Sequence, residues 1–192
     1  MHVFLNFGSS ASVVTCDLQD LLRHCVVYMI IVADKINKLE FSKIVALYAD
    51  DLEESRKRKY GRLSAYEGKI CAEQDYYLYL KDVFFTEMKG KLYISEENGR
   101  YISAACFEPF KDGLLLNSLV TDIDFRKKGY AQQLLRAAFE NFKDVSLYSH
   151  VHIRNIASIH LHEKLGFDIL HQYAHMLDGS VRSDHYTYIK NL

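Results

Sequence analysis

A short basic loop between an apolar run and a helical pattern is the feature that most constrains this chain. The loop reads Arg-Lys-Lys-Gly-Tyr-Ala at residues 126–131. Residues 114–120 before it predict a strand, and residues 131–142 after it have apolar side chains at helical spacing. Amides at a helix start lack intrahelical partners and carry partial positive charge. The sequence therefore predicts an anion site here, and Gly129 leaves the backbone open to a ligand.

A second segment, later in the chain, has the features of a short helix. Asn155 is a good N-cap residue, and Gly166 suits the position just beyond a helix end. Ala157, Leu161 and Leu165 recur every four residues and give the segment one apolar face. The pattern predicts a helix of about two to three turns.

Together the two segments resemble the GNAT superfamily of acetyl-CoA-dependent N-acetyltransferases. The family's loop has the pattern Arg/Gln-x-x-Gly-x-Gly/Ala, which Arg126, Gly129 and Ala131 match. The family's later helix has the pattern Asn-x-x-Ala/Ser-x-x-Leu-Tyr-x-Lys-x-Gly-Phe. The residues that match this second pattern are Asn155, Ser158, Leu161, Lys164, Gly166 and Phe167. His162 stands where the family has Tyr.

The other segments follow the order of elements in that family, β-α-α-β-β-β-α-β-α-β-β. The predicted strands are residues 26–32, 92–95, 101–107, 114–120, 145–153, 167–173 and 186–189. The predicted helices are residues 39–52, 71–85, 131–142 and 155–166. We therefore expect a single α/β domain at residues 29–192, with a mixed, mostly antiparallel sheet of about seven strands flanked by about four helices. Only residues 114–167 carry specific motif evidence.

Residues 1 to about 25 have no counterpart in this pattern, and we assign residues 1–28 to an N-terminal segment outside the domain. We expect an N-terminal extension, or a start assigned too early, that packs poorly against the domain. An extra surface helix at residues 17–27 is the alternative.

The resemblance implies how acetyl-CoA is bound as co-substrate. The pantetheine arm would lie along the strand end at residues 119–121, in a gap beside the strand at residues 145–153. The loop amides would cradle the pyrophosphate, although Lys127 and Lys128 could instead be solvated surface lysines. The candidate cofactor-binding residues are Leu119, Val120, Thr121, Arg126, Lys127, Lys128, Gly129, Tyr130, Ala131 and Asn155.

The chemistry requires an amine to attack a thioester and a thiolate to leave. The backbone amide of Val120 is the candidate donor to the developing oxyanion. His162 is the candidate general acid for the thiolate, and the alternative is a polar filler beside a water that protonates the product. The strand at residues 114–120 contains no carboxylate. The candidate general bases are Glu108, Asp122 and His150.

Composition excludes several other classes of protein. The 192 residues have a net charge of −1, so no global field attracts nucleic acid or an anionic membrane. The longest apolar run, residues 25–33, is too short to span a bilayer. Four scattered cysteines without a C-x-x-C pair favour a reducing, cytoplasmic setting. The histidines of residues 150–185 are not spaced to converge on a metal, so we expect none.

We therefore predict an acyltransferase that moves acetyl from acetyl-CoA to a primary amine of an unidentified small molecule or peptide. One alternative is a catalytically inactive CoA-binding module of the same fold. The other is a protein-interaction domain that uses the basic run at residues 56–59, which is otherwise a solvated helix end. A homodimer through a sheet edge is compatible with each of these hypotheses.

Overall fold

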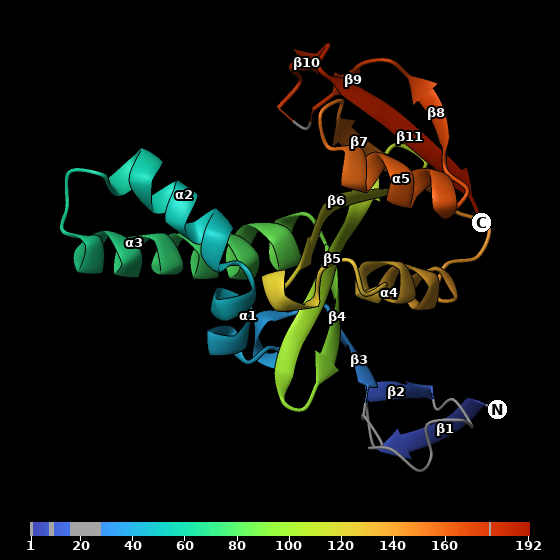
Figure 1. The fold of residues 1–192 in the computed structure, drawn as a ribbon, viewed down its shortest axis with the longest axis horizontal. Helices are drawn as coiled ribbons and strands as arrows, with labels where there is room; N and C mark the ends of the chain where they lie inside the picture. Colours follow the sequence, from blue (N-terminus) through green and yellow to red (C-terminus); the bar gives the residue numbers. More distant parts are fainter. Residues whose placement is uncertain (1, 8–9, 16–27, 177) are drawn as a thin grey trace.

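A seven-stranded sheet organises the chain (Figure 1). The computed structural model describes residues 2–7, 10–15, 28–176 and 178–192. In space the strands run in the order β3-β4-β5-β6-β7-β11-β8, and all neighbours are antiparallel except β6 and β7. The strands are β3 (Tyr28–Ala33), β4 (Lys91–Glu97), β5 (Arg100–Phe110), β6 (Gly113–Thr121), β7 (Ser146–His152), β8 (Asp168–His171) and β11 (His185–Asn191).

Helices cover both faces of this sheet (Figure 1). They are α1 (Phe41–Leu47), α2 (Ala49–Tyr60), α3 (Ala65–Leu78), the π-helix η2 (Tyr79–Glu87), α4 (Tyr130–Phe139), α5 (Ile156–Lys164) and the 3-10 turns η1 (Ile36–Lys38) and η3 (Ile123–Phe125). One core lies under α1 and η2 and includes the buried Ile44, Leu80 and Phe84. The other lies under α4 and includes Leu134 and Leu135. The predicted mixed, mostly antiparallel sheet of about seven strands is confirmed, with five α-helices in the described part of the chain.

The first two predicted helices have different bounds in the structure. The predicted helix at residues 39–52 is divided at Tyr48, whose φ and ψ of −97° and 20° separate α1 from α2. The next helix starts at Ala65, six residues before the predicted start. Ser64 caps it, because its Oγ accepts a hydrogen bond from the Glu67 amide while the Glu67 carboxylate accepts one from the Ser64 amide. This Ser-x-x-Glu signal was present in the sequence.

The helices α2 and α3 lie side by side and extend away from the sheet as a hairpin (Figure 1). The basic run at residues 56–59 ends α2 and is largely neutralised within the hairpin. Arg56 and Lys57 both pair with Glu53, at 2.6 and 3.4 Å, and Lys59 pairs with Asp75 at 3.1 Å. These contacts agree with the prediction of a solvated helix end.

Two small sheets flank the main one. Near the N-terminus, β1 (His2–Phe7) pairs with β2 (Ser10–Thr15), and in the C-terminal region β9 (Ala174–His175) pairs with β10 (Val181–Arg182). The alternative helix at residues 17–27 lies outside the described residues. The interpretation of residues 1–28 as an extension stays a prediction.

Candidate active site

The parallel strands β6 and β7 separate after a short paired stretch. Leu114 pairs with Leu147, and the last pair is Leu116 with Ser149. Beyond Leu116, β6 continues to Thr121 while it remains paired with β5 on its other side. One edge of β6 therefore faces an opening instead of a neighbouring strand, as the resemblance implies for the pantetheine arm.

A β-bulge lies where this opening begins. Cys106 of β5 pairs with Ser118, but the next residue, Phe107, pairs with Leu116, so Asn117 is the extra residue of β6. A bulge bends its strand and increases the local twist. The bend at Asn117 coincides with the point where β6 leaves β7.

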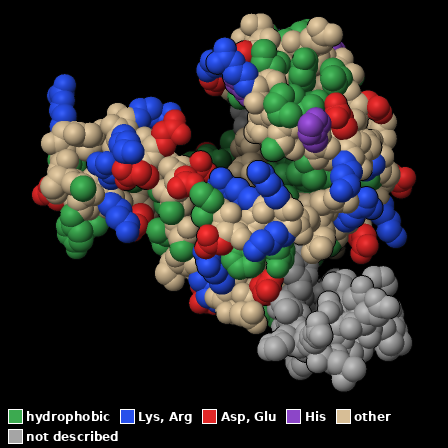
Figure 2. All heavy atoms as spheres, in the orientation of Figure 1, with side chains coloured by type: hydrophobic (Ala, Val, Ile, Leu, Met, Phe, Trp, Pro, Cys, Tyr) green, Lys and Arg blue, Asp and Glu red, His purple; other side chains and the backbone are tan. Residues whose placement is uncertain are grey.

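A groove of about 740 Å³ extends from this opening to the basic loop, and we call it the β6–α4 groove. Figure 2 shows the surface hollowed between the α2–α3 hairpin and the part built by α5 and β8–β11, with Lys and Arg side chains at the base of the hollow. The predicted cofactor-binding residues that line the groove are Leu119, Val120, Thr121, Arg126, Lys127, Gly129, Tyr130, Ala131 and Asn155. The predicted Lys128 and His162 are not among the lining residues.

The turn before α4 presents backbone to the groove. Gly129 has a φ of +89°, a left-handed conformation that favours glycine, and Lys127 has a φ of 63°. The first intrahelical bond runs from the Gln133 amide to the Gly129 carbonyl at 3.0 Å. A Cβ on Gly129 would meet no atom closer than Gln133 Nε2 at 3.9 Å. The helix start is thus open in the way that an anionic group requires.

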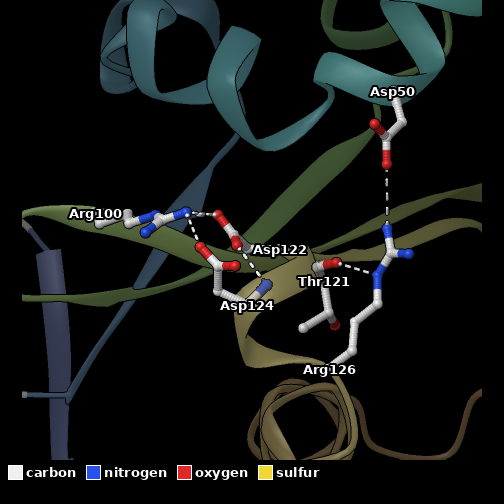
Figure 3. Close-up of polar contacts among 6 residues, drawn as sticks. All are labelled: Asp50, Arg100, Thr121, Asp122, Asp124 and Arg126. Carbon is white, nitrogen blue, oxygen red and sulfur yellow. Dashed lines mark hydrogen bonds and ion pairs between the residues drawn. The ribbon is translucent and has the colours of Figure 1, made fainter.

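The cations of the loop have different surroundings. Arg126 Nε donates to the Thr121 carbonyl at 2.9 Å, and its Nη2 lies 3.6 Å from Asp50 Oδ2 on α2 (Figure 3). Lys128 extends over the ring of Phe125, with 5.2 Å between its Nζ and the ring centroid. The guanidinium is therefore the side chain that links the end of β6 to the helical hairpin.

Asp122, one of the three candidate bases, is held by its own ion pair. Arg100 Nη2 lies 2.6 Å from Asp122 Oδ2 and 3.2 Å from Asp124 Oδ2 (Figure 3). The other oxygen, Asp122 Oδ1, accepts a hydrogen bond from the Asp124 amide at 3.0 Å. Both oxygens of Asp122 are thus engaged in fixing the end of β6.

The helix α5 forms the opposite wall and matches its predicted caps. Asn155 Oδ1 accepts a hydrogen bond from the Ser158 amide at 3.1 Å, and Gly166 has a φ of +75°. Of the predicted apolar face, Ala157 and Leu161 line the groove, whereas Leu165 is buried in the core. The spacing predicted one apolar face correctly but gave no signal that the groove would divide it.

His162 lies inside the protein and is 2% exposed. The centroid of its ring lies 4.9 Å from the ring centroid of Phe167 and 5.2 Å from that of Tyr188. Nδ1 lies 2.7 Å from the Ser158 carbonyl, which can only accept, so the proton of the neutral ring is on Nδ1. Burial lowers the pKa of His162, and Nε2 has no hydrogen-bond partner among the described residues. Its role as general acid stays a prediction.

A second hollow is lined by residues of β6 and β7, and we call it the β7 pocket. Its volume is about 430 Å³. The lining residues are Leu115, Leu116, Asn117, His150, Met176, Asp178 and His185. Ser118, the next residue of β6, lines the β6–α4 groove. The two linings therefore include consecutive residues of one strand, Asn117 and Ser118.

Glu108, another candidate base, is buried beneath this region. It is 2% exposed, and neither carboxylate oxygen has a hydrogen-bond partner among the described residues. Burial raises the pKa of Glu108, while Asn117 acts in the opposite direction. Burial and the nearby Glu108 also raise the pKa of Tyr79, at the start of η2, to about 12. Glu108 lines neither hollow.

Two carboxylates at the groove were not predicted from the sequence. Asp51 lines it and Asp50 contacts Arg126, although both belong to α2, some 75 residues before the loop. Within the described residues, no three His, Cys, Asp or Glu side chains gather as metal ligands. In the same part of the chain, no helix combines the length and apolar character needed to cross a membrane.

Comparisons with known proteins agree with this geometry. The model of the acetyltransferase (GNAT) family matches residues 46–167. Many solved structures share the fold at low sequence identity, and three of them illustrate the similarity. The PaiA N-acetyltransferase of Thermoplasma acidophilum, in complex with coenzyme A, has 16% identity and a TM-score of 0.54 over 85% of this chain and 99% of its own. A putative acetyltransferase of Acinetobacter baylyi has 15% identity and a TM-score of 0.59 over 88% of this chain and 95% of its own.

The third is an N-acetyltransferase of Staphylococcus aureus, with 19% identity and a TM-score of 0.51 over 84% of this chain and 98% of its own. Among curated proteins, no match was found. The family model covers well over half of the sequence and includes the loop, the groove and both motif segments. The chain therefore belongs to the acetyltransferase (GNAT) family.

Proposed function

We propose that this protein is an N-acetyltransferase that moves the acetyl group of acetyl-CoA to a primary amine. Membership of the family supports acetyl transfer in general. The observation that carries the finer proposal is the β6–α4 groove, which leads from the separation of β6 and β7 to the open start of α4. A similar fold that is described as a complex with coenzyme A supports the choice of acetyl donor.

The diphosphate of acetyl-CoA would lie at the start of α4. The backbone around Lys127, Lys128 and Gly129 would approach it most closely, because no Cβ fills the space at Gly129. Arg126 and Lys127 line the groove and would supply positive charge. The helix dipole and the amides of a first turn, which lack intrahelical acceptors, give such a site its preference for anions.

The antiparallel pairing of β5 and β6 determines which amides of β6 face the groove. The Asp122 amide donates to the Ile102 carbonyl at 2.8 Å, and two residues earlier Val120 is the partner of Ala104. Hydrogen-bonded pairs recur at every second residue of an antiparallel ladder. The amide of Val120 should therefore point toward β5, away from the groove.

By the same alternation, the amides of Leu119 and Thr121 point toward the groove. We propose that they hydrogen-bond the pantetheine arm, which would then lie along β6 like an added strand. Leu119 is nearer to Asn117 and is our preferred donor to the carbonyl oxygen as it gains negative charge. Val120 as this donor stays a prediction that the pairing disfavours.

The protein's residues would contribute mainly by position. Acetyl-CoA supplies the thioester whose carbonyl carbon the amine attacks. Holding the two reactants in one orientation can contribute about 7–11 kcal/mol to lowering the barrier. His162 remains the predicted acid for the departing thiolate, although its buried ring, with the proton on Nδ1, argues for a packing role. A cytoplasmic location and a homodimer also remain predictions.

Calorimetry and a thiol-release assay test the proposal together. We expect the protein to bind coenzyme A and to release free thiol from acetyl-CoA when a primary amine is added. The double variant Arg126→Glu/Lys128→Glu should lose this binding. The double variant Arg58→Glu/Arg62→Glu makes the same charge reversal at the exposed end of the helical hairpin. It should still bind coenzyme A.

Two results would contradict the proposal. Binding of coenzyme A without amine-dependent thiol release would favour the inactive module, and no binding at all would favour an interaction domain. No described feature of the groove favours either alternative at present.

A further inference from the structure

The β7 pocket begins where β6 and β7 have just separated. Asn117 and His150 follow the last paired residues of the two strands, Leu116 and Ser149, and both line the pocket. Ser118 already lines the β6–α4 groove. The linings of the pocket and of the groove thus include consecutive residues of β6, Asn117 and Ser118.

His150 faces the pocket because of the alternation along β7. Leu147 and Val151 belong to the core under α4, so Tyr148 and His150 project from the opposite face of the sheet. The ring of Phe110, from β5, packs edge-on against both rings. The centroid distances are 5.4 Å to Tyr148 and 5.7 Å to His150. The imidazole is thus held in place within the wall of the pocket.

A neighbouring hydroxyl sets the tautomer of His150. Thr187 Oγ1 donates its single proton to the Tyr173 carbonyl at 2.7 Å. Toward His150 Nδ1, which lies 3.2 Å away, the same oxygen can then only accept. The proton of the neutral imidazole is therefore on Nδ1. The lone pair is left on Nε2, a buried atom with no hydrogen-bond partner among the described residues.

The surroundings of His150 favour this neutral form. Burial is the main cause that lowers its pKa. A hydrogen bond with the backbone of His175 raises the pKa, whereas the facing groups His185, Lys111 and the His175 ring lower it further. These groups come from β11, from the turn between β5 and β6 and from β9. At neutral pH the ring is thus uncharged and can accept a proton.

The other two candidate bases are placed less well. Asp122 uses both carboxylate oxygens in contacts with Arg100 and Asp124. Glu108 is buried and lines neither hollow. Among the three candidates, only His150 lines one of the two hollows, and its Nε2 has no hydrogen-bond partner among the described residues.

We propose that the β7 pocket binds the acceptor as a compact cationic amine and that His150 is the catalytic base that takes a proton from it. This inference rests on the proposed acetyl transfer. A volume of about 430 Å³ suits a small molecule. Asp178 is the one carboxylate in its lining, and contacts with Ser180, whose amide donates to Asp178 Oδ1 at 2.9 Å, lower the pKa of Asp178.

The proposed step balances in protons and electrons. The ammonium group gives one proton to His150 Nε2, and the freed lone pair forms the new nitrogen–carbon bond. The carbon–sulfur bond breaks, and its electron pair leaves with the sulfur. The second proton that the nitrogen loses, on becoming an amide, neutralises the thiolate. His150 then releases its proton to solvent, so the net products are the amide, the thiol and one proton.

The variant His150→Gln tests the base. We expect kcat/KM to fall by about 100-fold, within the usual range for a general base, and the acid limb of its pH profile to disappear. Coenzyme A binding, measured by calorimetry, should not change. His171 lies on β8 and lines neither hollow, so His171→Gln is the matched control. Its kcat/KM, acid limb and coenzyme A binding should stay close to wild type. An unchanged acid limb in His150→Gln would overturn the assignment.

The hydroxyl of Thr187 provides a second test that a merely structural role would not satisfy. Thr187→Val removes the acceptor for Nδ1–H but keeps the shape of the side chain. Thr187→Ser retains the acceptor. We expect the valine variant to lose kcat/KM and to shift the acid limb, and the serine variant to recover both. Equal behaviour of the two variants would contradict the tautomer assignment.

The acceptor class is tested with amines of matched length. We expect 1,4-diaminobutane to be acetylated better than butylamine, and 4-aminobutanoate to be poorest, because Asp178 attracts cations and repels carboxylates. Asp178→Asn should reduce the differences in acetylation rate among the three amines. Asp168→Asn, on β8, should leave these differences unchanged. A short peptide acetylated faster than all three amines would refute the compact acceptor. Failure of wild type to bind coenzyme A would instead refute the underlying acetyl transfer.

Discussion

Arg126 at the β6–α4 groove forms an ion pair with Asp50 of α2, with 3.6 Å between Nη2 and Oδ2 (Figure 3). The same guanidinium donates from Nε to the Thr121 carbonyl. Arg126 thus connects the strand that would hold pantetheine with the helical hairpin. A diphosphate bound at the loop would compete with Asp50 for this cation, so the pair should oppose cofactor binding slightly.

The variant Asp50→Asn should bind coenzyme A more tightly than wild type. The side chains of Arg126 and Asp50 are 50% and 80% exposed, and such exposed pairs contribute at most about 1 kcal/mol. We therefore expect a gain of at most about fivefold in affinity, which calorimetry at low salt can resolve. Glu54→Gln makes the same charge change on α2 and should have a smaller effect. Equal affinities in the two variants would show that Asp50 does not compete.

The variant Gly129→Ala should weaken coenzyme A binding more than it weakens the fold. A left-handed φ costs a residue with a Cβ about 1–2 kcal/mol, and the turn can relieve this cost by moving its amides away from the ligand. Gly99→Ala is the matched control, because Gly99 also has a positive φ, at +78°, but lies in the β4–β5 hairpin. Unfolding by urea and calorimetric affinity should separate the two effects. Unchanged affinity in Gly129→Ala would count against the loop as the diphosphate site.

The central part of the fold could be predicted because its signals are local. A loop with one glycine and three cations, an asparagine cap and a glycine at the helix end identified both motif segments. The structure has α4 starting at Tyr130 and α5 following Asn155, close to the predicted positions. Caps and turns depend on a few adjacent residues, so one sequence is sufficient to recognise them.

The arrangement of the site could not be predicted in the same way. Asp50 meets Arg126 only after the sheet has formed, and no spacing in the sequence relates the two. His150 was one of three candidate bases, and its distinction arises from Thr187 and Tyr173 on later segments. Contacts of this kind depend on strand order and register, which hydrophobic periodicity does not encode.

Glu108→Gln should change how stability depends on pH. Burial raises the pKa of Glu108 above its ordinary 4.5, so folding favours the protonated carboxyl. The stability that this group contributes is complete below its unfolded pKa and is lost as pH rises through the folded pKa. Glutamine does not ionise, so the free energy of unfolding of this variant does not fall for that reason as pH rises. Its free energy of unfolding should exceed that of wild type increasingly as pH rises from 4.5 toward 8, as urea titrations can measure. The exposed Glu140→Gln should show no such trend.

His162→Phe tests whether this buried ring acts as an acid or as part of the core. Burial lowers its pKa, so folding favours the neutral ring, and wild-type stability should fall as pH drops below 6.5. The phenylalanine variant should lose that dependence, as thermal unfolding at pH 5 and 8 can measure. A general acid would cost about 100-fold or more in kcat. Nδ1 is hydrogen-bonded to the Ser158 carbonyl, and His162 does not line the groove. We therefore expect kcat to change by less than about 100-fold. A loss of that size in a variant that still binds coenzyme A would instead establish His162 as the acid.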